Sequence, residues 1–542
     1  MTLSARSPAT PGAFAPFGHV AFAVLWFATV ASNIGTWMHD VGAAWLMTEL
    51  SPSPLLVATV QASTTLPMFM FALLAGAVAD IVDRRRLLIL VNVALAAAAV
   101  ALAFLTAAGV MTPALLLAFT FAFGTGAAFI APAWQAIVPQ LVPRDALTSA
   151  IALNSMGINA ARAIGPALAG VLIVAAGVAA PFAANAVSYL AIVVALLWWR
   201  SPPRGDGMLP RERLGGALVG GLRFAFASSA LKATLVRAAA FFLFASAYWA
   251  MLPLVARTVL GGGPGLYGAL MGAAGAGAVA GALLMPWLKV RLGADRLVAA
   301  GTLGTAATLA LFAVVSAPAV AVAASLLAGA SWIAVLANLN VSAQTALPDW
   351  VRARGLSVFI TVFFGSMTAG SLLWGQVANA AGIQAALLAA AAGAALAIPL
   401  TWGFKLMQAA DVDHTASAHW PQPIVSDTVT ADRGPVLVTV EYDVDPDDGD
   451  AFVTAMLEVR QERRRHGAVG WSLQQDAAAP HLWLETFRHG SWLEHQRQHA
   501  RVSHAEADAE ARARTHHRGP EAPRVRHLLG PAPPAARRAA MS

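Results

Sequence analysis

Long apolar runs are the feature of this sequence that most constrains its fold. Between residues 18 and 408 such runs follow one another, separated by short segments rich in charged or turn-forming residues. Crossing a hydrocarbon core of about 30 Å takes roughly 20 residues at about 1.5 Å each, and the runs are long enough. The whole chain is 58% hydrophobic and 12% charged, whereas a soluble domain carries about 25% charged residues. The sequence therefore excludes an entirely soluble protein and predicts a polytopic membrane protein.

Twelve helical spans are predicted from the positions of these runs. The first six are expected near 18–46, 54–79, 87–108, 113–137, 148–175 and 180–199. The second six are expected near 234–258, 265–288, 294–315, 317–344, 354–380 and 384–408.

Basic residues in the short loops set the expected orientation of these spans. Most of them fall on one side of the membrane, at Arg84–Arg86, Arg144, 200–232, Lys289 and Arg352. The opposite loops hold mainly Arg257 and the acids Asp40 and Glu49. The positive-inside rule then places both termini in the cytoplasm. The same rule explains the net charge of +7 without a nucleic-acid partner.

Seven segments are expected along the chain. They are a cytoplasmic N-terminal segment (1–17), a six-helix half (18–199), a cytoplasmic central loop (200–233), a second six-helix half (234–408), a linker (409–432), a soluble α+β domain (433–530) and a disordered tail (531–542). Pro143–Arg144, after the fourth span, is echoed by Arg352 and Arg354 after the tenth. Internal repetition is typical of transporters, in which one half moves against the other about a site at the midplane.

A charged motif joins the second and third spans. Gly76 is followed by Asp80 four residues later, and then by Arg84 and Arg85. Gly76 is expected to permit close helix approach, and Asp80 to face a helix N-terminus or a basic partner across the interface between the halves. The arginines are expected to anchor the cytoplasmic edge. The alternative is an ordinary positive-inside loop that contains an aspartate.

The fifth span contains a second motif. Gly165 and Gly170 have no side chains, so a facing helix can approach closely there. Pro166 leaves a backbone carbonyl without its helical hydrogen bond and bends the helix. The eighth span repeats the small residues at Gly268, Gly272, Gly277 and Gly281. The alternative is generic packing of membrane helices.

Arg162 is the charge placed deepest in any predicted span. It lies fourteen residues into the span 148–175, about 21 Å from the cytoplasmic edge. A charge at that depth is costly and is usually paired or functional. Asp40, late in the first span and at similar depth, is the expected partner and the leading candidate for carrying a proton. The alternative is a structural ion pair without a role in turnover.

A sparsely polar cavity is expected between the spans. Its candidate lining residues are Asn33, Trp37, Gln61, Asn154 and Asn159. Such a lining suits amphipathic or aromatic small molecules better than sugars or small anions, which require denser hydrogen bonding or fixed charge. Isolated Ser and Thr residues in these helices are expected to bond their own backbone.

These motifs resemble the major facilitator superfamily, in the branch that contains enterobactin exporters and transmembrane secretion effectors. The resemblance is carried by Ser32–Trp37, by the Asp80 loop, and by the run from Asn154 through Arg162 to Gly170. It implies a twelve-helix fold of two six-helix halves, with the fifth and eighth helices at the interface between them. It also implies efflux driven by the proton gradient, as in an antiporter for siderophores or drugs.

The polar tail is predicted to form a small α+β unit. Strands are expected at Val436–Tyr442, 468–475 and 481–487, and helices at 451–465 and 491–513. This pattern is similar to the ferredoxin-like antibiotic-biosynthesis monooxygenase domains, which implies a docking module or self-association. His495 and His499 have the spacing of metal ligands on one helix face. The chain offers no evident third ligand, so a solvated helix face without metal is expected, and no cofactor motif or enzyme activity is predicted.

Three functions remain open on the sequence alone. The first is a proton-coupled exporter of small amphipathic molecules. The second is a membrane-tethered oxygenase whose helices deliver substrate to the tail. The third is a sensor or scaffold that does not transport.

Overall fold

The computed structural model describes residues 12–200, 228–348, 351–407, 433–465, 467–501 and 504–530. The predicted central loop and linker lie almost wholly outside these residues, and the predicted C-terminal tail lies wholly outside them. The described chain divides into a bundle of long helices and a second unit that contains a four-stranded sheet. Each is described by itself.

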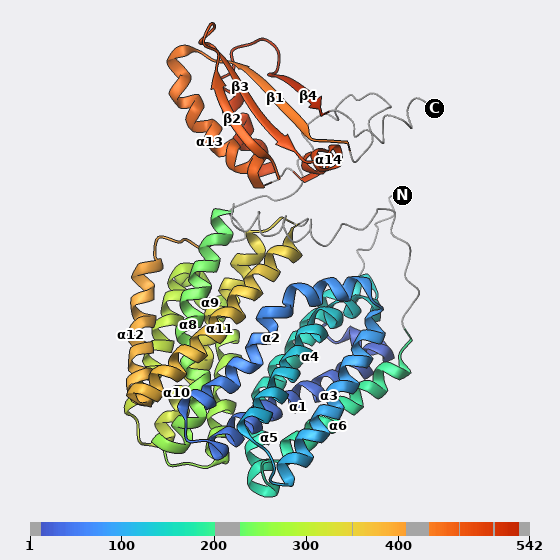
Figure 1. Cartoon of the computed structure of the whole chain (residues 1–542), viewed down its shortest axis with the longest axis vertical. Helices are drawn as coiled ribbons and strands as arrows, with labels where there is room; N and C mark the ends of the chain where they lie inside the picture. Colours follow the sequence, from blue (N-terminus) through green and yellow to red (C-terminus); the bar gives the residue numbers. More distant parts are fainter. Residues whose placement is uncertain are drawn as a thin grey trace, which may run out of the picture. The chain divides into compact units, whose positions relative to one another are not determined.

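Six long helices form the first half of the bundle (Figure 1). Their bounds are α1 Val20–Leu50, α2 Pro54–Ile81, α3 Arg84–Ala107, α4 Pro113–Leu141, α5 Leu147–Ala176 and α6 Ala180–Trp198. Helix α1 packs against α5 and α6, α2 packs against α4, and α3 packs against α4 and α6. Even α6, with 19 residues, reaches about 28 Å at about 1.5 Å per residue, close to the thickness of a hydrocarbon core.

The second half is built from α8 Ser229–Leu254 with a π-helical turn at Val255–Val259, α9 Pro264–Val314, α10 Pro318–Thr345, α11 Arg352–Ala381 and α12 Ile383–Thr401. Helix α9 is 51 residues long, about 77 Å if it were straight, which is more than twice a hydrocarbon core. It is broken at Gly293, whose φ of 72° lies in the left-handed region that favours glycine. The eleven described helices that are long and apolar enough to cross a membrane therefore supply twelve spans.

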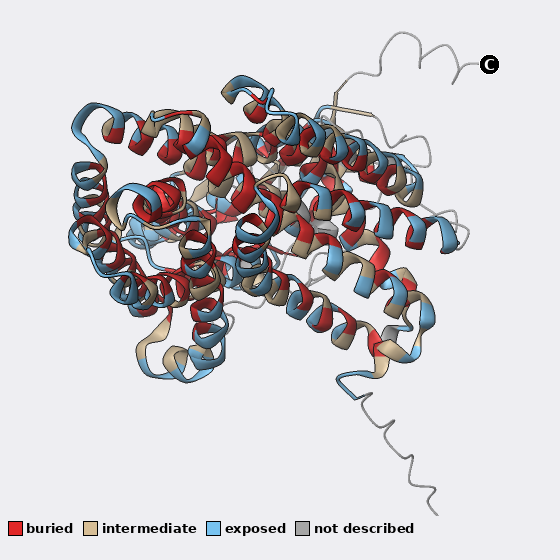
Figure 2. Ribbon diagram, turned by 90° about the horizontal axis from the view of Figure 1, so that it is seen from below, coloured by how far each residue is buried: buried red, intermediate tan, exposed pale blue. Residues whose placement is uncertain are grey.

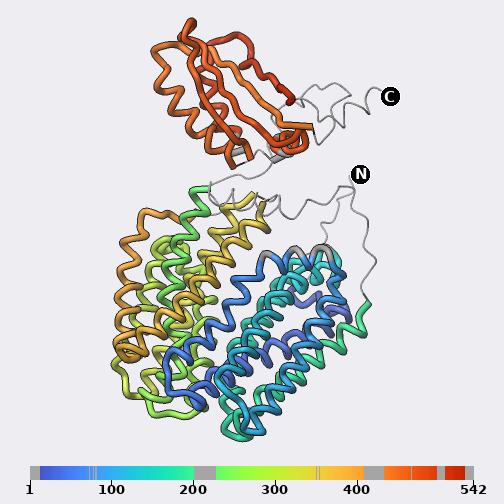
Figure 3. Tube along the Cα trace, viewed as in Figure 1, coloured from blue at the N-terminus to red at the C-terminus, as the bar shows by residue number. Residues whose placement is uncertain are grey.

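Large apolar side chains cover the outside of this bundle. Leu90, Phe104, Leu283 and Val290 are each more than two thirds exposed. Buried residues instead line the sides of the helices that face one another (Figure 2). Such an outer surface would be a liability in water and suits a lipid solvent. The traces of the two halves are separate bundles of helices that meet toward the bottom of Figure 3.

The C-terminal unit has one antiparallel sheet in the order β2-β3-β1-β4. Its elements are β1 Val436–Asp443, α13 Gly449–Arg465, β2 Val469–Gln475, β3 Leu482–His489, α14 Trp492–Arg501, α15 His504–Arg514 and β4 Arg524–Leu529. Alternate side chains of β1 are buried against α13 and its neighbours, around Phe452 and Met456. The three predicted strands are confirmed, and β4 was not predicted. The helix predicted at 491–513 covers α14 and α15, and residues 502 and 503 between them lie outside the described part of the chain.

Candidate functional site

The two halves of the bundle come into close contact through α5 and α9. A Cβ atom added at Gly268 would lie 2.8 Å from the carbonyl oxygen of Pro166 and 2.9 Å from the Cα of Gly170. One added at Gly275 would lie 2.6 Å from the Cα of Ala163. Contacts this short are not made by real Cβ atoms, so only glycine allows these two backbones to lie so close. The predicted packing of the fifth span against the eighth is confirmed.

Other glycines of the two motifs face different neighbours. A Cβ at Gly165 would lie 2.5 Å from the Cβ of Trp37, so this glycine admits α1 and not α9. Gly277 and Gly281 face α10 within the second half. The sequence identified the small residues correctly, but it could not assign each one to its partner helix.

A second seam between the halves runs along α2 and α11. The hydroxyl groups of Thr65 and Thr368 lie 2.7 Å apart, in hydrogen-bond contact. One end of the seam is closed by Ser53, whose hydroxyl donates to the side-chain oxygen of Asn379 at 3.2 Å. Each of the two seams therefore joins a helix of the first half to a helix of the second half.

Aromatic and charged side chains add a third contact where α1 ends. The rings of Trp45 and Tyr267 stack with centroids 6.2 Å apart. Arg257, in the π-helical turn, donates to the hydroxyl of Thr48 at 3.0 Å. These residues lie at the same end of the bundle as Ser53 and Asn379. We call this end of the bundle the contact end.

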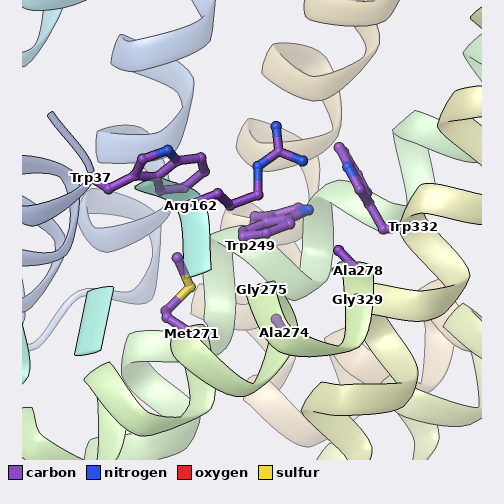
Figure 4. Close-up of a pocket in the computed structure, with 9 residues that line it drawn as sticks. All are labelled: Trp37, Arg162, Trp249, Met271, Ala274, Gly275, Ala278, Gly329 and Trp332. Atoms are coloured by element: carbon purple, nitrogen blue, oxygen red, sulfur yellow. The ribbon is translucent and has the colours of Figure 1, made fainter. Parts of the chain in front are cut away.

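A small cavity lies about halfway along α5, between the halves (Figure 4). Arg162 and Trp37 come from the first half, and the other lining residues are Trp249, Met271, Ala274, Gly275, Ala278, Gly329 and Trp332. The space they leave is about 10 Å³, roughly what one water molecule needs. A substrate therefore requires these side chains, or the halves themselves, to move apart.

Arg162 is held in this cavity against Trp37. Its guanidinium carbon lies 5.4 Å from the centroid of the Trp37 ring. Such a cation–π contact is worth about 0.5–2 kcal/mol, whereas a charge at the centre of a span costs about 2.5–3.5 kcal/mol or more. The tryptophan therefore offsets only part of the cost of burying this charge.

The predicted ion pair of Arg162 with Asp40 is wrong. Within the described residues no ion pair joins the two side chains, and the cavity is lined by Trp37 in place of Asp40. The positions lie one turn apart on α1, so a modest rotation of the helix decides which of them meets α5. Asp40 instead lies close enough to Tyr189 and Tyr267 to interact electrostatically with both.

The remaining residues predicted to line the cavity lie elsewhere in the helices. Asn154 accepts a hydrogen bond from the indole nitrogen of Trp134 at 3.0 Å, and Asn159 donates to the carbonyl oxygen of Ser155 at 2.9 Å. Asn33 and Gln61 are half-buried, on α1 and α2. None of these four is among the residues that line the Arg162 cavity.

In the loop between α2 and α3, the arginines donate to backbone carbonyl oxygens of neighbouring helices, and those of Arg85 lie at a helix C-terminus. Arg85 donates to the carbonyl oxygens of Leu196 and Leu197, in the last turn of α6, at 2.8 Å each. Arg84 donates to the carbonyl oxygen of Ala136 at 3.3 Å. Cations at helix C-termini are favourable because unpaired carbonyls and the helix dipole meet there.

Gly76 of this loop differs from expectation, and Asp83 has a structural role that was not predicted. An added Cβ at Gly76 would meet no described atom within 4 Å, so the close helix approach predicted there is absent. Asp83 caps α3, because its carboxylate accepts from the backbone N–H of Arg86 at 2.8 Å. An aspartate directly before a helix is a recognisable cap, and this signal was available in the sequence. The side chain of Asp80, in the last turn of α2, is outside the described part of the chain.

A buried ion pair in the second half was not predicted. Arg237, on α8, is 3% exposed and donates to the carboxylate of Asp295, just after the break in α9. Arg237 lies inside the predicted span 234–258, so its charge was a visible signal.

The C-terminal unit contains a buried charge network. The carboxylate of Glu485 is 0% exposed and accepts from Arg463 Nε at 3.1 Å and from the indole nitrogen of Trp471 at 2.9 Å. Arg463 also pairs with the buried Glu510. Burial alone lowers the pKa of Arg463, but the two carboxylates more than offset this and raise it above its usual value. The guanidinium therefore stays charged inside the domain.

Three histidine rings gather near α14. His495 is 1% exposed, and its ring centroid lies 5.4 Å from that of His489 and 4.7 Å from that of His527. The solvated face expected for His495 is therefore wrong, and the side chain of His499 is outside the described residues. Within the described part of the chain, no group of three His, Asp or Glu residues has the geometry to hold a metal ion.

Acid is expected to destabilise the C-terminal unit through His527. Burial lowers the pKa of this ring below its usual 6.5. The unfolded chain then binds more protons there, so stability rises with pH and is lost as the pH falls below the unfolded value. Urea-dependent proteolysis of the full chain at about pH 7.5 and about pH 5.5 measures this loss. His527→Phe should reduce the pH difference, and an unchanged difference would contradict this assignment.

The paired halves, the seams of α5 with α9 and α2 with α11, and the cavity between them form an architecture of the major facilitator type. A family model described as transmembrane secretion effector matches residues 11–534, and the chain belongs to that family.

Two curated relatives match part of the chain. The staphyloferrin A transporter of Staphylococcus aureus (strain NCTC 8325 / PS 47) is 29% identical over 166 residues, which are 30% of this chain and 42% of the relative. The uncharacterized MFS-type transporter YfiS of Bacillus subtilis (strain 168) is 25% identical over 168 residues, 31% of this chain and 39% of the relative. The matches thus span about two fifths of these relatives.

Solved transporter structures share the fold. A POT family transporter in complex with a thioalcohol-conjugated peptide superposes with a TM-score of 0.59 at 14% identity, covering 71% of this chain and 95% of that one. A bacterial homologue of the human lysosomal transporter Spinster, in an inward-facing conformation, gives a TM-score of 0.53 at 17% identity, covering 71% of this chain and 94% of that one. At these identities the likeness concerns the fold alone.

Proposed function

We propose that the chain exports small amphipathic molecules, siderophore-like or drug-like, across a bacterial inner membrane by alternating access. The observation that carries the proposal is a cavity lined by residues of both halves. It lies beside seams in which the backbones of the two halves are in close contact, so that each half can move as a unit against the other. The relative that transports staphyloferrin A supports a siderophore-like solute. The Gly165–Pro166 helix, which resembles that of facilitator exporters, supports export over uptake.

The proposed orientation has both termini in the cytoplasm. Arg84 and Arg85 lie at the end of the helices opposite to the contact end, and basic residues favour the cytoplasmic side. The contact end then faces the outside. Opening the cavity to the outside requires the contacts of Ser53 with Asn379 and of Thr48 with Arg257 to break.

Proton antiport is the proposed energy source, with Asp40 as the carrier. Asp40 lies on α1 near Tyr267 of α9, so its charge acts on a residue of the other half. Loss or gain of a proton at this position therefore changes an interaction between the halves, which is the requirement for coupling to their movement.

The C-terminal unit is proposed to be a ferredoxin-like module that mediates self-association. Two observations support the first part, the ferredoxin-like fold. They are the order of strands and helices, β-α-β-β-α-β with two helices in the second crossover, and the order of the strands in the sheet. The face of the sheet that carries Leu437 and Leu528 supports the second part, because Leu528 is 51% exposed there.

Inside-out membrane vesicles test the proposed transport. Acidifying the lumen should drive uptake of fluorescent amphipathic dyes or iron-free siderophores into vesicles that contain the full chain. Asp40→Asn should reduce uptake to the level of vesicles without the protein, while Asp83→Asn, which changes a helix cap, should retain it. The absence of gradient-driven uptake over a broad panel would contradict export. Unchanged uptake by Asp40→Asn would exclude Asp40 as the proton carrier.

A further inference from the structure

The cavity at Arg162 combines one positive charge with three tryptophan rings. Arg162 is the charged member of its nine lining residues, and Trp37, Trp249 and Trp332 surround it from α1, α8 and α10 (Figure 4). We infer that this cavity binds an amphipathic anion, with a carboxylate or similar acidic group against Arg162 and an aromatic or apolar body against the tryptophans. The inference rests on the proposed function and names the class of molecule that the transporter carries.

Two buried donors in this cavity have no acceptor within the described part of the chain. They are Nε of Arg162 and the indole Nε1 of Trp249. Both are N–H groups, so each is satisfied by an oxygen that accepts, and one of them carries a full positive charge. A buried donor without a partner is costly, and a ligand oxygen at this place removes that cost for both groups.

The positive charge in the cavity lining favours a ligand of negative charge. A cationic ligand would be repelled by Arg162 and would meet no carboxylate among the lining residues. A sugar would need many hydrogen bonds, and the lining offers mainly aromatic rings, alanine, glycine and the thioether of Met271. An acidic group attached to an apolar body satisfies both the guanidinium and the rings, and Met271 can adapt to its shape.

The two donors come from different halves of the transporter. Arg162 belongs to α5, and Trp249 belongs to α8. An anion bound by both would join the halves at mid-depth, next to the close contact of Gly275 with Ala163. Binding therefore favours the conformations in which both halves contact the anion, and release follows when one half loses its contact.

Equilibrium binding to the purified full chain in detergent tests this inference with three matched probes: 2-naphthoate, neutral 2-naphthamide and cationic 2-naphthylmethylammonium. The wild type should bind naphthoate at least about tenfold more tightly than either analogue. Arg162→Gln should remove this preference, Arg162→Lys should keep part of it, and Trp249→Phe should weaken naphthoate binding several-fold. Lys405→Gln and Trp198→Phe, which remove an exposed charge and an exposed indole, should leave it unchanged.

A wild type without preference for naphthoate, or a preference that survives in Arg162→Gln, overturns the inference. Should Arg162→Gln not fold, Trp249→Phe decides, since it keeps an aromatic ring and removes the donor; undiminished naphthoate binding there overturns the inference as well. The vesicle assay separates this outcome from failure of the proposed function. Anion preference without gradient-driven uptake contradicts export alone, and uptake without anion preference contradicts this inference alone.

Discussion

Replacing Gly275 by alanine is expected to shift the conformational balance of the transporter and to reduce its transport strongly. The added Cβ would lie 2.6 Å from the Cα of Ala163 and 3.0 Å from the carbonyl oxygen of Arg162. Both are backbone atoms, so α5 and α9 must separate. Overpacking of this kind costs about 1–3 kcal/mol, which changes the ratio of two conformations by about 5- to 150-fold.

Gly272→Ala is the matched control for this change. Gly272 lies one turn earlier on α9 and faces the same helix, but a Cβ there would be 3.4 Å from the Cβ of Ala167, an ordinary contact distance. The two variants make the same chemical change in the same seam. They differ in whether the new methyl group fits.

Cross-linking measures the shift directly, because the chain contains no cysteine. Cysteines introduced at Ser53 and Asn379, whose side chains lie 3.2 Å apart, should form a disulfide when the contact end is closed. The yield should fall in Gly275→Ala and not in Gly272→Ala, with transport falling in parallel. Equal yields in the two variants would show that this seam does not control the contact end.

The membrane spans could be predicted from the sequence, because each accumulates its signal over about twenty residues and lipid excludes alternatives. One boundary between two spans differs from the prediction. A break was expected between 288 and 294, yet α9 continues through Lys289 and Arg291 to Gly293. Lysine and arginine are good helix formers, so a charged segment between two spans need not leave the helix. The break is set by the one residue that takes a left-handed conformation.

The candidate site was predicted only in part, because it depends on how each helix is rotated. Trp37 and Asp40 lie on nearby positions of α1, and the sequence does not decide which of them meets Arg162. The pair of Arg237 with Asp295 joins residues 58 positions apart, and hydropathy carries no information about such a contact. Arg162 itself was found because one charge in an apolar span is conspicuous at any rotation.

Glu485→Ala is expected to cost the C-terminal unit about 3–5 kcal/mol of its stability. The substitution removes one of the carboxylates that pair with the buried guanidinium of Arg463. It also removes the acceptor of two further donors, the buried hydroxyl of Tyr442 and the half-buried indole of Trp471. Small domains are stable by only about 5–15 kcal/mol, so the loss is a large part of the total.

The exposed pair of Arg512 with Glu458 provides the control for that prediction. Both side chains are more than half exposed, and such pairs contribute about 0–1 kcal/mol, so Glu458→Ala should have little effect. Urea-dependent proteolysis of the full chain in membranes measures both variants, by the denaturant concentration at which the C-terminal unit is cleaved. A small effect of Glu485→Ala would mean that water reaches Arg463 and that the network is not closed. A large effect joined with unchanged dye uptake would mean that the helices transport without a folded C-terminal unit. That result would contradict the membrane-tethered oxygenase, in which the helices deliver substrate to this unit.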